Sequence, residues 1–133
     1  TSLKDVRAFF AAAWAALKPS GMLAFDVSSR YKLSTVLGQN TFAEDEPDAA
    51  YIWKNAYDGV SKLLCMELTF FRRMDDGRYR RFTEEHIQRA HAASELTDAL
   101  RRTGFCDIAA YGAFTFEAPQ RTDERLQFVA RKG

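Results

Sequence analysis

The feature that most constrains the fold is a helix that runs into a helix-breaking loop and then a short apolar segment. Apolar residues recur at helical spacing from Ser2 to Leu17. Ser2 is a suitable N-cap, and Asp5 follows three residues later, as in a capping box. After a Pro-Ser-Gly stop, the run from Met22 to Val27 shows little alternation. Such a run predicts a strand covered on both faces, as in a parallel or mixed α/β sheet.

The middle of the chain predicts an antiparallel meander of three long strands. Asp-Gly turn signals separate the three segments. The predicted strands are 51–57, 60–73 and 79–91. Before them, 31–37 predicts a short helix closed by Gly38, and the acidic, proline-containing segment 44–48 predicts a loop.

The last third predicts a second helix and two strands. The helix starts at Ser94 and ends at Gly104, a residue that readily adopts the left-handed conformation of a helix terminus. The strands are 105–111 and 126–130. The whole chain is therefore expected to form a single α/β domain with three parts: a helix-strand-helix over 1–38, the meander over 49–91, and a helix with two closing strands over 94–133.

Composition narrows the classes of function. A formal net charge of +1 over 133 residues argues against a dedicated nucleic-acid binder. The longest apolar run, 8–17, is too short to span a membrane, and no signal-peptide pattern is present. Cys65 and Cys106 are too few for a disulfide framework or a zinc site. We therefore expect a cytoplasmic protein with two reduced, buried thiols and no membrane partner.

The motifs of several enzyme classes are missing from the sequence. None of the seven glycines form a G-x-G pair, so there is no dinucleotide fingerprint or phosphate loop. The two histidines, His86 and His91, stand five residues apart in a predicted strand, where they would point to opposite faces. No metal site is expected, because a metal ion needs more ligands than this pair supplies.

Glu84-Glu85-His86 is the triplet with the clearest chemical potential. A carboxylate can orient a histidine that acts as a general base. In a strand, however, Glu84 and His86 share a face while Glu85 points to the other. The favoured interpretation is structural, with Glu85 paired to a cross-strand arginine and His86 hydrogen-bonded within the sheet.

Two larger groups of side chains in the meander have both structural and functional explanations. One is a set of arginines mixed with acidic residues, which favours solvated cross-strand pairs but could also provide an anion ligand. The arginines are Arg72, Arg73, Arg78, Arg80, Arg81 and Arg89. The other is an aromatic group that could be core, a pocket lining or a dimer patch. Its members are Tyr51, Trp53, Tyr57, Phe70, Phe71, Tyr79 and Phe82.

The segment LKPSG followed by MLAFDV resembles the helix–loop–strand that leads into the fifth strand of class I S-adenosylmethionine-dependent methyltransferases. That loop usually reads LKPGG, and Ser20 takes the place of its first glycine here. Further segments resemble one bacterial small-molecule methyltransferase subfamily, in the same order. They are FDVSSRYKLSTVLG, YIWKNAYD, LTFFRR, RYRRFTEEHIQRAH, a helix ending in TGF, and QFVARK.

The resemblance implies the C-terminal, substrate-side half of a Rossmann-like methyltransferase. The family binds its cofactor through a G-x-G loop and an acidic residue, both upstream of the matching segments. No cofactor-binding residue can therefore be assigned, and S-adenosylmethionine is expected to bind the full-length protein but not this chain alone. The inserted strands cover the active site in the family, which implies a small-molecule methyl acceptor. The implied substrate-binding candidates are Asp26, Tyr31, Trp53, Tyr57, Arg81 and His86. Because methyl transfer depends largely on positioning, no catalytic residue is assigned.

The resemblance also implies a strand order. Segment 126–130 would lie between 22–27 and 105–111, antiparallel to both. Segment 22–27 would then keep an open edge, and it contains no Pro or Lys to block pairing with another chain. We therefore expect a homodimer through this edge. Two alternatives stay open: a non-catalytic module that binds a small ligand, and a dimerisation or assembly module.

Overall fold

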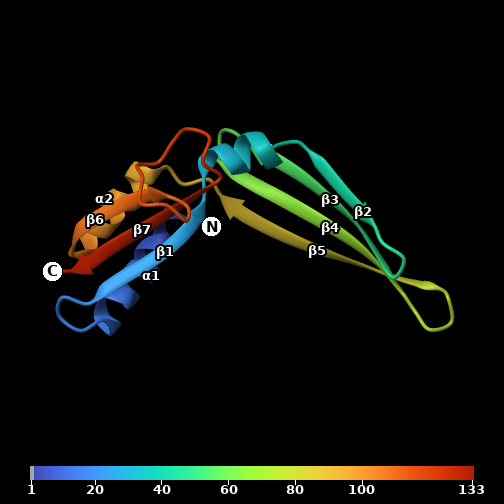
Figure 1. The fold of residues 1–133 in the computed structure, drawn as a ribbon, viewed down its shortest axis with the longest axis horizontal. Coiled ribbons are helices and arrows are strands. Elements are labelled where there is room, and N and C mark those ends of the chain that lie inside the picture. Colours follow the sequence, from blue (N-terminus) through green and yellow to red (C-terminus); the bar gives the residue numbers. More distant parts are fainter. Residues whose placement is uncertain (1) are drawn as a thin grey trace.

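The computed structural model describes residues 2–133, which form two sheets set at an angle to each other (Figure 1). The three-stranded sheet has the order β1-β7-β6, and the meander sheet has the order β2-β3-β4-β5. The short helix η1 lies where the two sheets meet, and the β2–β3 and β4–β5 hairpin tips extend away from the three-stranded sheet (Figure 1). The predicted α/β class is confirmed.

Helix α1 (Leu3–Ala16) has the capping box that the sequence predicts. The Asp5 amide donates to the Ser2 hydroxyl at 3.2 Å, and the Ser2 amide donates to the Asp5 carboxylate at 2.9 Å. These bonds satisfy amides that a helix start otherwise leaves unpaired. The hydrogen bonds lower the pKa of the Asp5 carboxyl.

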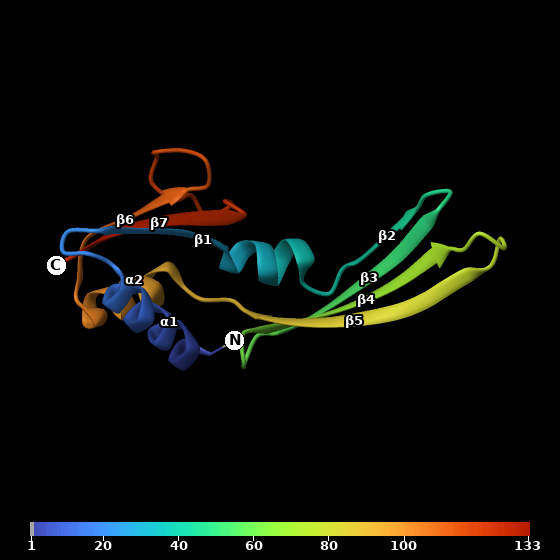
Figure 2. The ribbon, with the colours of Figure 1, turned by 90° about the horizontal axis from the view of Figure 1, so that it is seen from below.

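The strand order expected of the three-stranded sheet is confirmed. Strand β7 (Arg125–Lys132) lies between β1 (Met22–Ser28) and β6 (Phe105–Gly112), antiparallel to both. Phe25 on β1 stands opposite Phe128 on β7, and their rings stack at 5.2 Å. Both helices pack on one face of this sheet (Figure 2).

The expectation that 22–27 is covered on both faces is wrong. Exposure alternates along β1, and Met22 is 65% exposed. Leu23, Phe25 and Val27 pack against the core beneath the helices, while the other face of the strand carries no helix (Figure 2). The apolar Met22 and Ala24 on the outer face are what made the run look buried on both sides.

The first hydrophobic core lies between the two helices and the three-stranded sheet. Its fully buried members come from α1, from α2 (Ala93–Thr103) and from strands β6 and β7. They are Phe10, Leu96, Ala99, Leu100, Phe105, Leu126, Phe128 and Ala130. Helix α2 ends at Gly104, whose φ of 108° confirms the predicted left-handed terminus.

The meander sheet contains one strand more than the sequence predicts. The long strands β3 (Ala49–Asp58), β4 (Leu63–Arg73) and β5 (Tyr79–Arg89) are confirmed. Strand β2 (Thr41–Asp45) pairs antiparallel with β3 and takes in part of the acidic segment predicted as a loop. All five β2 residues are exposed, so the strand has no buried face to mark it in the sequence.

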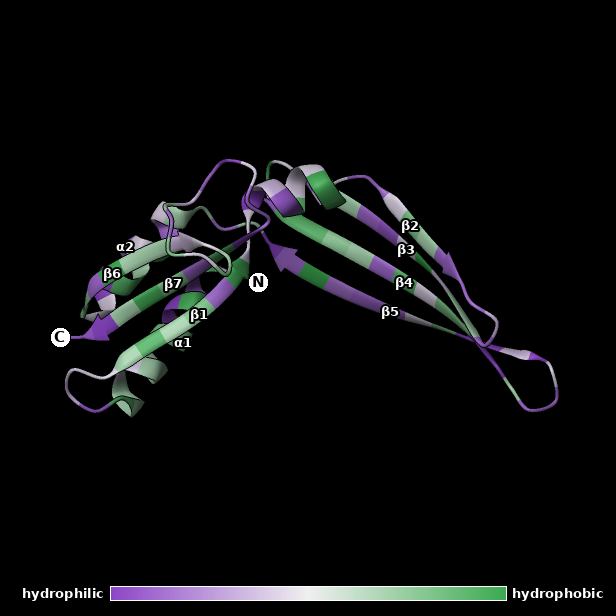
Figure 3. Ribbon diagram, in the orientation of Figure 1, coloured by the Kyte–Doolittle hydropathy of each residue, from purple (hydrophilic) through white to green (hydrophobic). Residues whose placement is uncertain are grey.

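A second, smaller core lies beneath η1 (Lys32–Leu37), whose turns have π-helical spacing. It contains Leu33, Leu37, Leu64, Met66 and Ala90. The predicted short helix and its closing Gly38 are thus confirmed. Farther out, the meander sheet is thinly covered: β5 is mostly hydrophilic beside the more hydrophobic β4 (Figure 3), and Ile52, Phe82 and Ile87 are exposed.

The two cysteine thiols are less buried than the sequence predicts. Both thiols are free, but Cys65 is exposed and Cys106 is half-buried, so the prediction of buried thiols is wrong. Cys65 follows the buried Leu64 of the core beneath η1, so it lies on the opposite face of the meander sheet. Among residues 2–133, no helix is long and apolar enough to cross a bilayer.

Candidate functional site

The meander sheet brings three of the predicted substrate residues to one face and leaves another on the opposite face. Trp53 and Tyr57 lie on one face of β3. His86 on β5 points to the same face, because it is in register with Met66 on β4 and Asn55 on β3. Both aromatic side chains pack against the core beneath η1, and the buried Trp53 Nε1 has no hydrogen-bond partner. Arg81 stands opposite Phe71, on the other face. The four residues therefore do not form one site.

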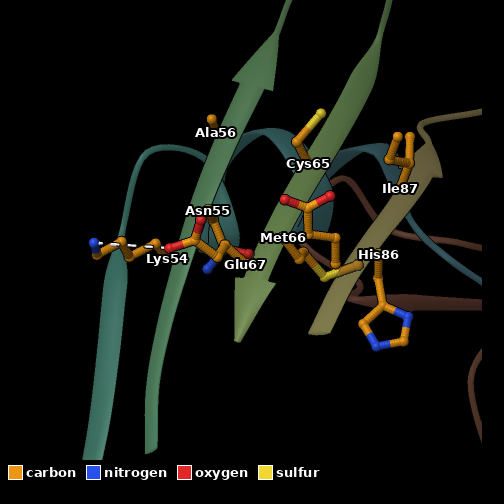
Figure 4. A pocket seen from close by; sticks show the side chains of 9 residues that line it. Lys54, Asn55, Ala56, Cys65, Met66, Glu67, His86 and Ile87 are labelled. Carbon is orange, nitrogen blue, oxygen red and sulfur yellow. Dashed lines mark ion pairs between the residues drawn. The ribbon is translucent and has the colours of Figure 1, made fainter. Parts of the chain in front are cut away.

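A shallow hollow of about 470 Å³ crosses the meander sheet over β3, β4 and β5 (Figure 4). Cys65 and Ile87 point to one side of the sheet, whereas Met66 and His86 point to the other (Figure 4). Because strand side chains alternate between faces, His86 cannot present its ring to the same space as Cys65. This hollow is an uncovered sheet surface and not an enclosed binding site.

Glu84 and His86 are in contact on their shared face, but within residues 2–133 Glu85 has no ion pair with the arginine partner predicted for it. His86 Nε2 lies 3.3 Å from the Glu84 carboxylate, and both side chains are more than half exposed. Glu85 stands directly opposite Glu67, a like-charged neighbour, and Lys54 lies 3.8 Å from that Glu67. The Glu84–His86 pair is a solvated contact on the sheet, which agrees with the structural interpretation.

The remaining two candidates, Asp26 and Tyr31, lie nearer the junction of the two sheets. The Asp26 carboxylate on β1 accepts hydrogen bonds from the Arg125 guanidinium on β7. Asp26 lines a cleft of about 390 Å³ that reaches from the end of β1 to the end of β5. Tyr31, half-buried at the start of η1, is not among the residues that line this cleft.

We call this space the interlobe cleft, because residues of both the three-stranded sheet and the meander sheet line it. Its lining residues are Asp26, Val27, Ser28, Leu33, Ile87, Gln88, Arg89, His91 and Arg125. A second space, the apolar groove of about 380 Å³, adjoins it beneath α1. The two spaces share Asp26, Val27 and His91 as lining residues, so the polar cleft and the apolar groove adjoin each other at the end of β1.

Glu95 at the start of α2 ties the helix to one end of the meander sheet, where β4 begins and β5 ends. Its carboxylate accepts the Ala92 amide at 3.0 Å and lies 3.4 Å from the Arg89 guanidinium. Lys62, in the turn before β4, approaches to 3.9 Å, and so does His91 Nδ1. The amide hydrogen bond and the neighbouring cations lower the pKa of the Glu95 carboxyl.

His91 is the titratable side chain that the sequence did not single out for this site. Its side chain is only 12% exposed, and its buried Nδ1 has no hydrogen-bond partner. Burial, with the nearby Arg89 cation, lowers the pKa of the imidazole, although Glu95 opposes the shift. The sequence placed His91 inside a strand, whereas β5 ends at Arg89 and His91 lies in the link to α2.

The comparisons with known proteins agree with the fold. Two curated bacterial proteins, each named "Putative methyltransferase", align with 96% of this chain: one from Geobacillus sp. (strain WCH70) at 36% identity and YqeM from Bacillus subtilis (strain 168) at 34%. An S-adenosylmethionine-dependent methyltransferase structure from Clostridium acetobutylicum ATCC 824 aligns with 99% of the chain at 30% identity and a TM-score of 0.89. This chain is a homologue of S-adenosylmethionine-dependent methyltransferases.

The homology has a defined extent. The chain spans about half the length of the curated relatives and of the Clostridium structure that it matches. No family model matches the sequence. The resemblance inferred from the sequence motifs is thus confirmed over the whole chain, as a partial match to its relatives.

The described residues do not fit S-adenosylmethionine as a complete site. A nucleoside cofactor in this class of fold needs a glycine-rich turn between a strand and a helix. The glycines with positive φ in residues 2–133 instead close η1, a hairpin and α2: Gly38, Gly77 and Gly104. The same residues contain no cluster of three or more metal-ligating side chains.

Proposed function

We propose that this chain forms the acceptor-binding side of an S-adenosylmethionine-dependent methyltransferase that acts on a small molecule. The observation that carries the proposal is the interlobe cleft at the carboxyl end of β1, which continues into the apolar groove. In α/β sheets, ligands bind beyond the carboxyl ends of the strands. Homology to methyltransferases over half their length supports the reaction class.

The size and lining of the hollow favour a small acceptor. Cleft and groove measure about 390 and 380 Å³, within the range of small-molecule sites. The net charge of +1 offers no electrostatic basis for a nucleic-acid substrate. Asp26 is the predicted candidate that lines this hollow, whereas Trp53 and Tyr57 pack against the core beneath η1 and His86 is an exposed contact of the meander sheet.

A chimeric enzyme tests this function. The half of the Bacillus subtilis relative that this chain matches is replaced by residues 1–133, and S-adenosylmethionine binding is measured by calorimetry. The chimera is expected to bind the cofactor, whereas the chain alone is expected not to bind it with useful affinity. Tritiated methyl groups should then appear in the low-mass fraction of a bacterial extract.

The controls separate the parts of the proposal. Asp26→Asn in the chimera should reduce methyl transfer while leaving cofactor affinity unchanged. Label found only in protein or nucleic acid would refute the small-molecule acceptor. A folded chimera that binds the cofactor and labels nothing would refute the proposed role of this chain in transfer.

A homodimer through the edge of β1 is a separate proposal. Within residues 2–133, β1 pairs on one side only, with β7, and its outer edge carries no strand. Open strand edges readily pair with another chain. Light scattering at micromolar concentration is expected to report a dimer, and Ala24→Lys, but not Ala24→Ser, should shift it to monomer. A monomer for the unmodified chain would refute this interface.

A further inference from the structure

We infer that the apolar groove and the interlobe cleft together bind a phenol, with the aromatic ring in the groove and the hydroxyl donating to Nε2 of His91. This inference rests on the proposed function in one respect only: it names the chemical class of the methyl acceptor. The binding itself requires no cofactor and no methyl transfer.

The groove supplies a surface suited to an aromatic ring. Its apolar lining comes from α1, β1 and α2: Val6, Phe9, Phe10, Phe25 and Leu96. The ring centroid of Phe10 lies 5.9 Å from that of Phe9 and 5.3 Å from that of Phe25, and the rings are tilted in both pairs. Phe9 is 56% exposed, so a ligand ring placed against it would remove apolar surface from water. The volume of about 380 Å³ accommodates one or two rings.

His91 is the polar group at the end of this groove that can meet a hydroxyl. It lines both the groove and the cleft. Its Nδ1 is buried and lies 3.9 Å from the Glu95 carboxylate, so we assign Nε2 as the ring nitrogen that meets the ligand. A carboxylate beside Nδ1 favours the tautomer with the proton on Nδ1, and Nε2 then becomes a hydrogen-bond acceptor.

Burial keeps the His91 imidazole neutral near pH 7. It is the largest cause that lowers the pKa of the imidazole, the Arg89 cation from β5 adds to it, and Glu95 from α2 opposes it. Lys62 faces Glu95 from the turn before β4. Across the cleft, the Asp26 carboxylate from β1 and the Arg125 guanidinium from β7 form an ion pair with each other. A neutral imidazole among compensated charges is an acceptor for a neutral donor.

This combination distinguishes a phenol from other aromatic ligands. An aromatic carboxylate would place a second negative charge near Asp26 and would offer no proton to Nε2. An aromatic ammonium would need one of the two carboxylates that line the groove, but Asp5 already accepts hydrogen bonds from Ser2 and Asp26 is paired with Arg125. A phenol brings an apolar ring and one neutral donor, which is what the two parts of the hollow offer.

The test uses the intact chain, p-cresol as the probe and 4-methylanisole as its matched control without a hydroxyl donor. The chain has only two histidines, so nitrogen-15 NMR reports each ring separately once His86→Phe and His91→Phe assign them. The His91 ring should be a neutral tautomer with its proton on Nδ1, and p-cresol should shift Nε2. We expect p-cresol to bind about tenfold more tightly than 4-methylanisole, which corresponds to about 1.4 kcal/mol.

The variants make the result decisive. His91→Phe should remove the difference between the two ligands, whereas His86→Phe should leave it intact. Phe9→Ala, an exposed position, should weaken both ligands by a similar factor and so tests the groove even if His91→Phe folds poorly. Equal affinities in the unmodified chain, or p-cresol shifts confined to His86, would overturn the inference. Because no cofactor takes part, such a failure leaves the methyltransferase proposal standing, and an inactive chimera leaves the phenol site standing.

Discussion

Removing the Glu95 carboxylate should loosen the junction between α2 and the meander sheet. Glu95 accepts the Ala92 amide at 3.0 Å, and losing such a helix cap costs about 1 kcal/mol. It also pairs with Arg89, whose side chain is only 18% exposed. A mostly buried guanidinium left without its partner adds about 1–2 kcal/mol. The Lys62 contact at 3.9 Å is looser and adds little.

Glu95→Ala is therefore expected to lower the free energy of unfolding by about 2–3 kcal/mol in urea denaturation followed by circular dichroism. Glu95→Gln is the matched control, because its amide oxygen can still accept the Ala92 amide. It should cost roughly half as much, since only the ion pairs are lost. A Glu95→Ala variant within about 0.5 kcal/mol of the unmodified chain would refute the argument that this carboxylate links α2 to the meander sheet.

Three further predictions concern single sites. Gly104→Ala should lower the free energy of unfolding by at least about 2 kcal/mol, because φ is 108° and the new Cβ would lie 3.1 Å from Trp14 Nε1. Gly77→Ala has open space around its Cβ and should cost less, and thermal denaturation of both variants checks this. His91→Phe should flatten the fall in stability between pH 7 and about 5.5, because the lowered pKa of folded His91 lets the unfolded state bind more protons in that range. A slope of stability against pH equal to that of the unmodified chain would count against this, and His86→Phe is the control. Trp53→Phe should change the unfolding free energy by less than about 1 kcal/mol, because it removes a buried Nε1 that has no partner. Trp53→Ala should cost about 3 kcal/mol, and equal losses for the two variants in urea denaturation would contradict this.

Most of the regular structure could be predicted from the sequence. The N-cap at Ser2, the left-handed terminus at Gly104 and the long strands of the meander depend on residues within a few positions of one another. Strand β2 could not be predicted in this way. Its five residues are all exposed, and only the pairing with β3 makes them a strand. The supposed second covered face of β1 failed for the converse reason, because an apolar side chain does not show whether anything lies against it.

For the candidate site too, some features follow from the local sequence and others only from tertiary contacts. From the sequence alone, the residue types, the order of the elements and the kinship with methyltransferases were determined, because each is read from local pattern or from an ordered series of motifs. The tertiary structure alone decided that Asp26 and Arg125 meet across 99 residues, that His86 lies exposed on a sheet face, and that His91 is buried at the junction. The physical reason is that burial and ion pairing at the junction arise between residues far apart in sequence. Lys62 reaches Glu95 because β4 pairs with β5 next to the start of α2, and no local propensity encodes that contact.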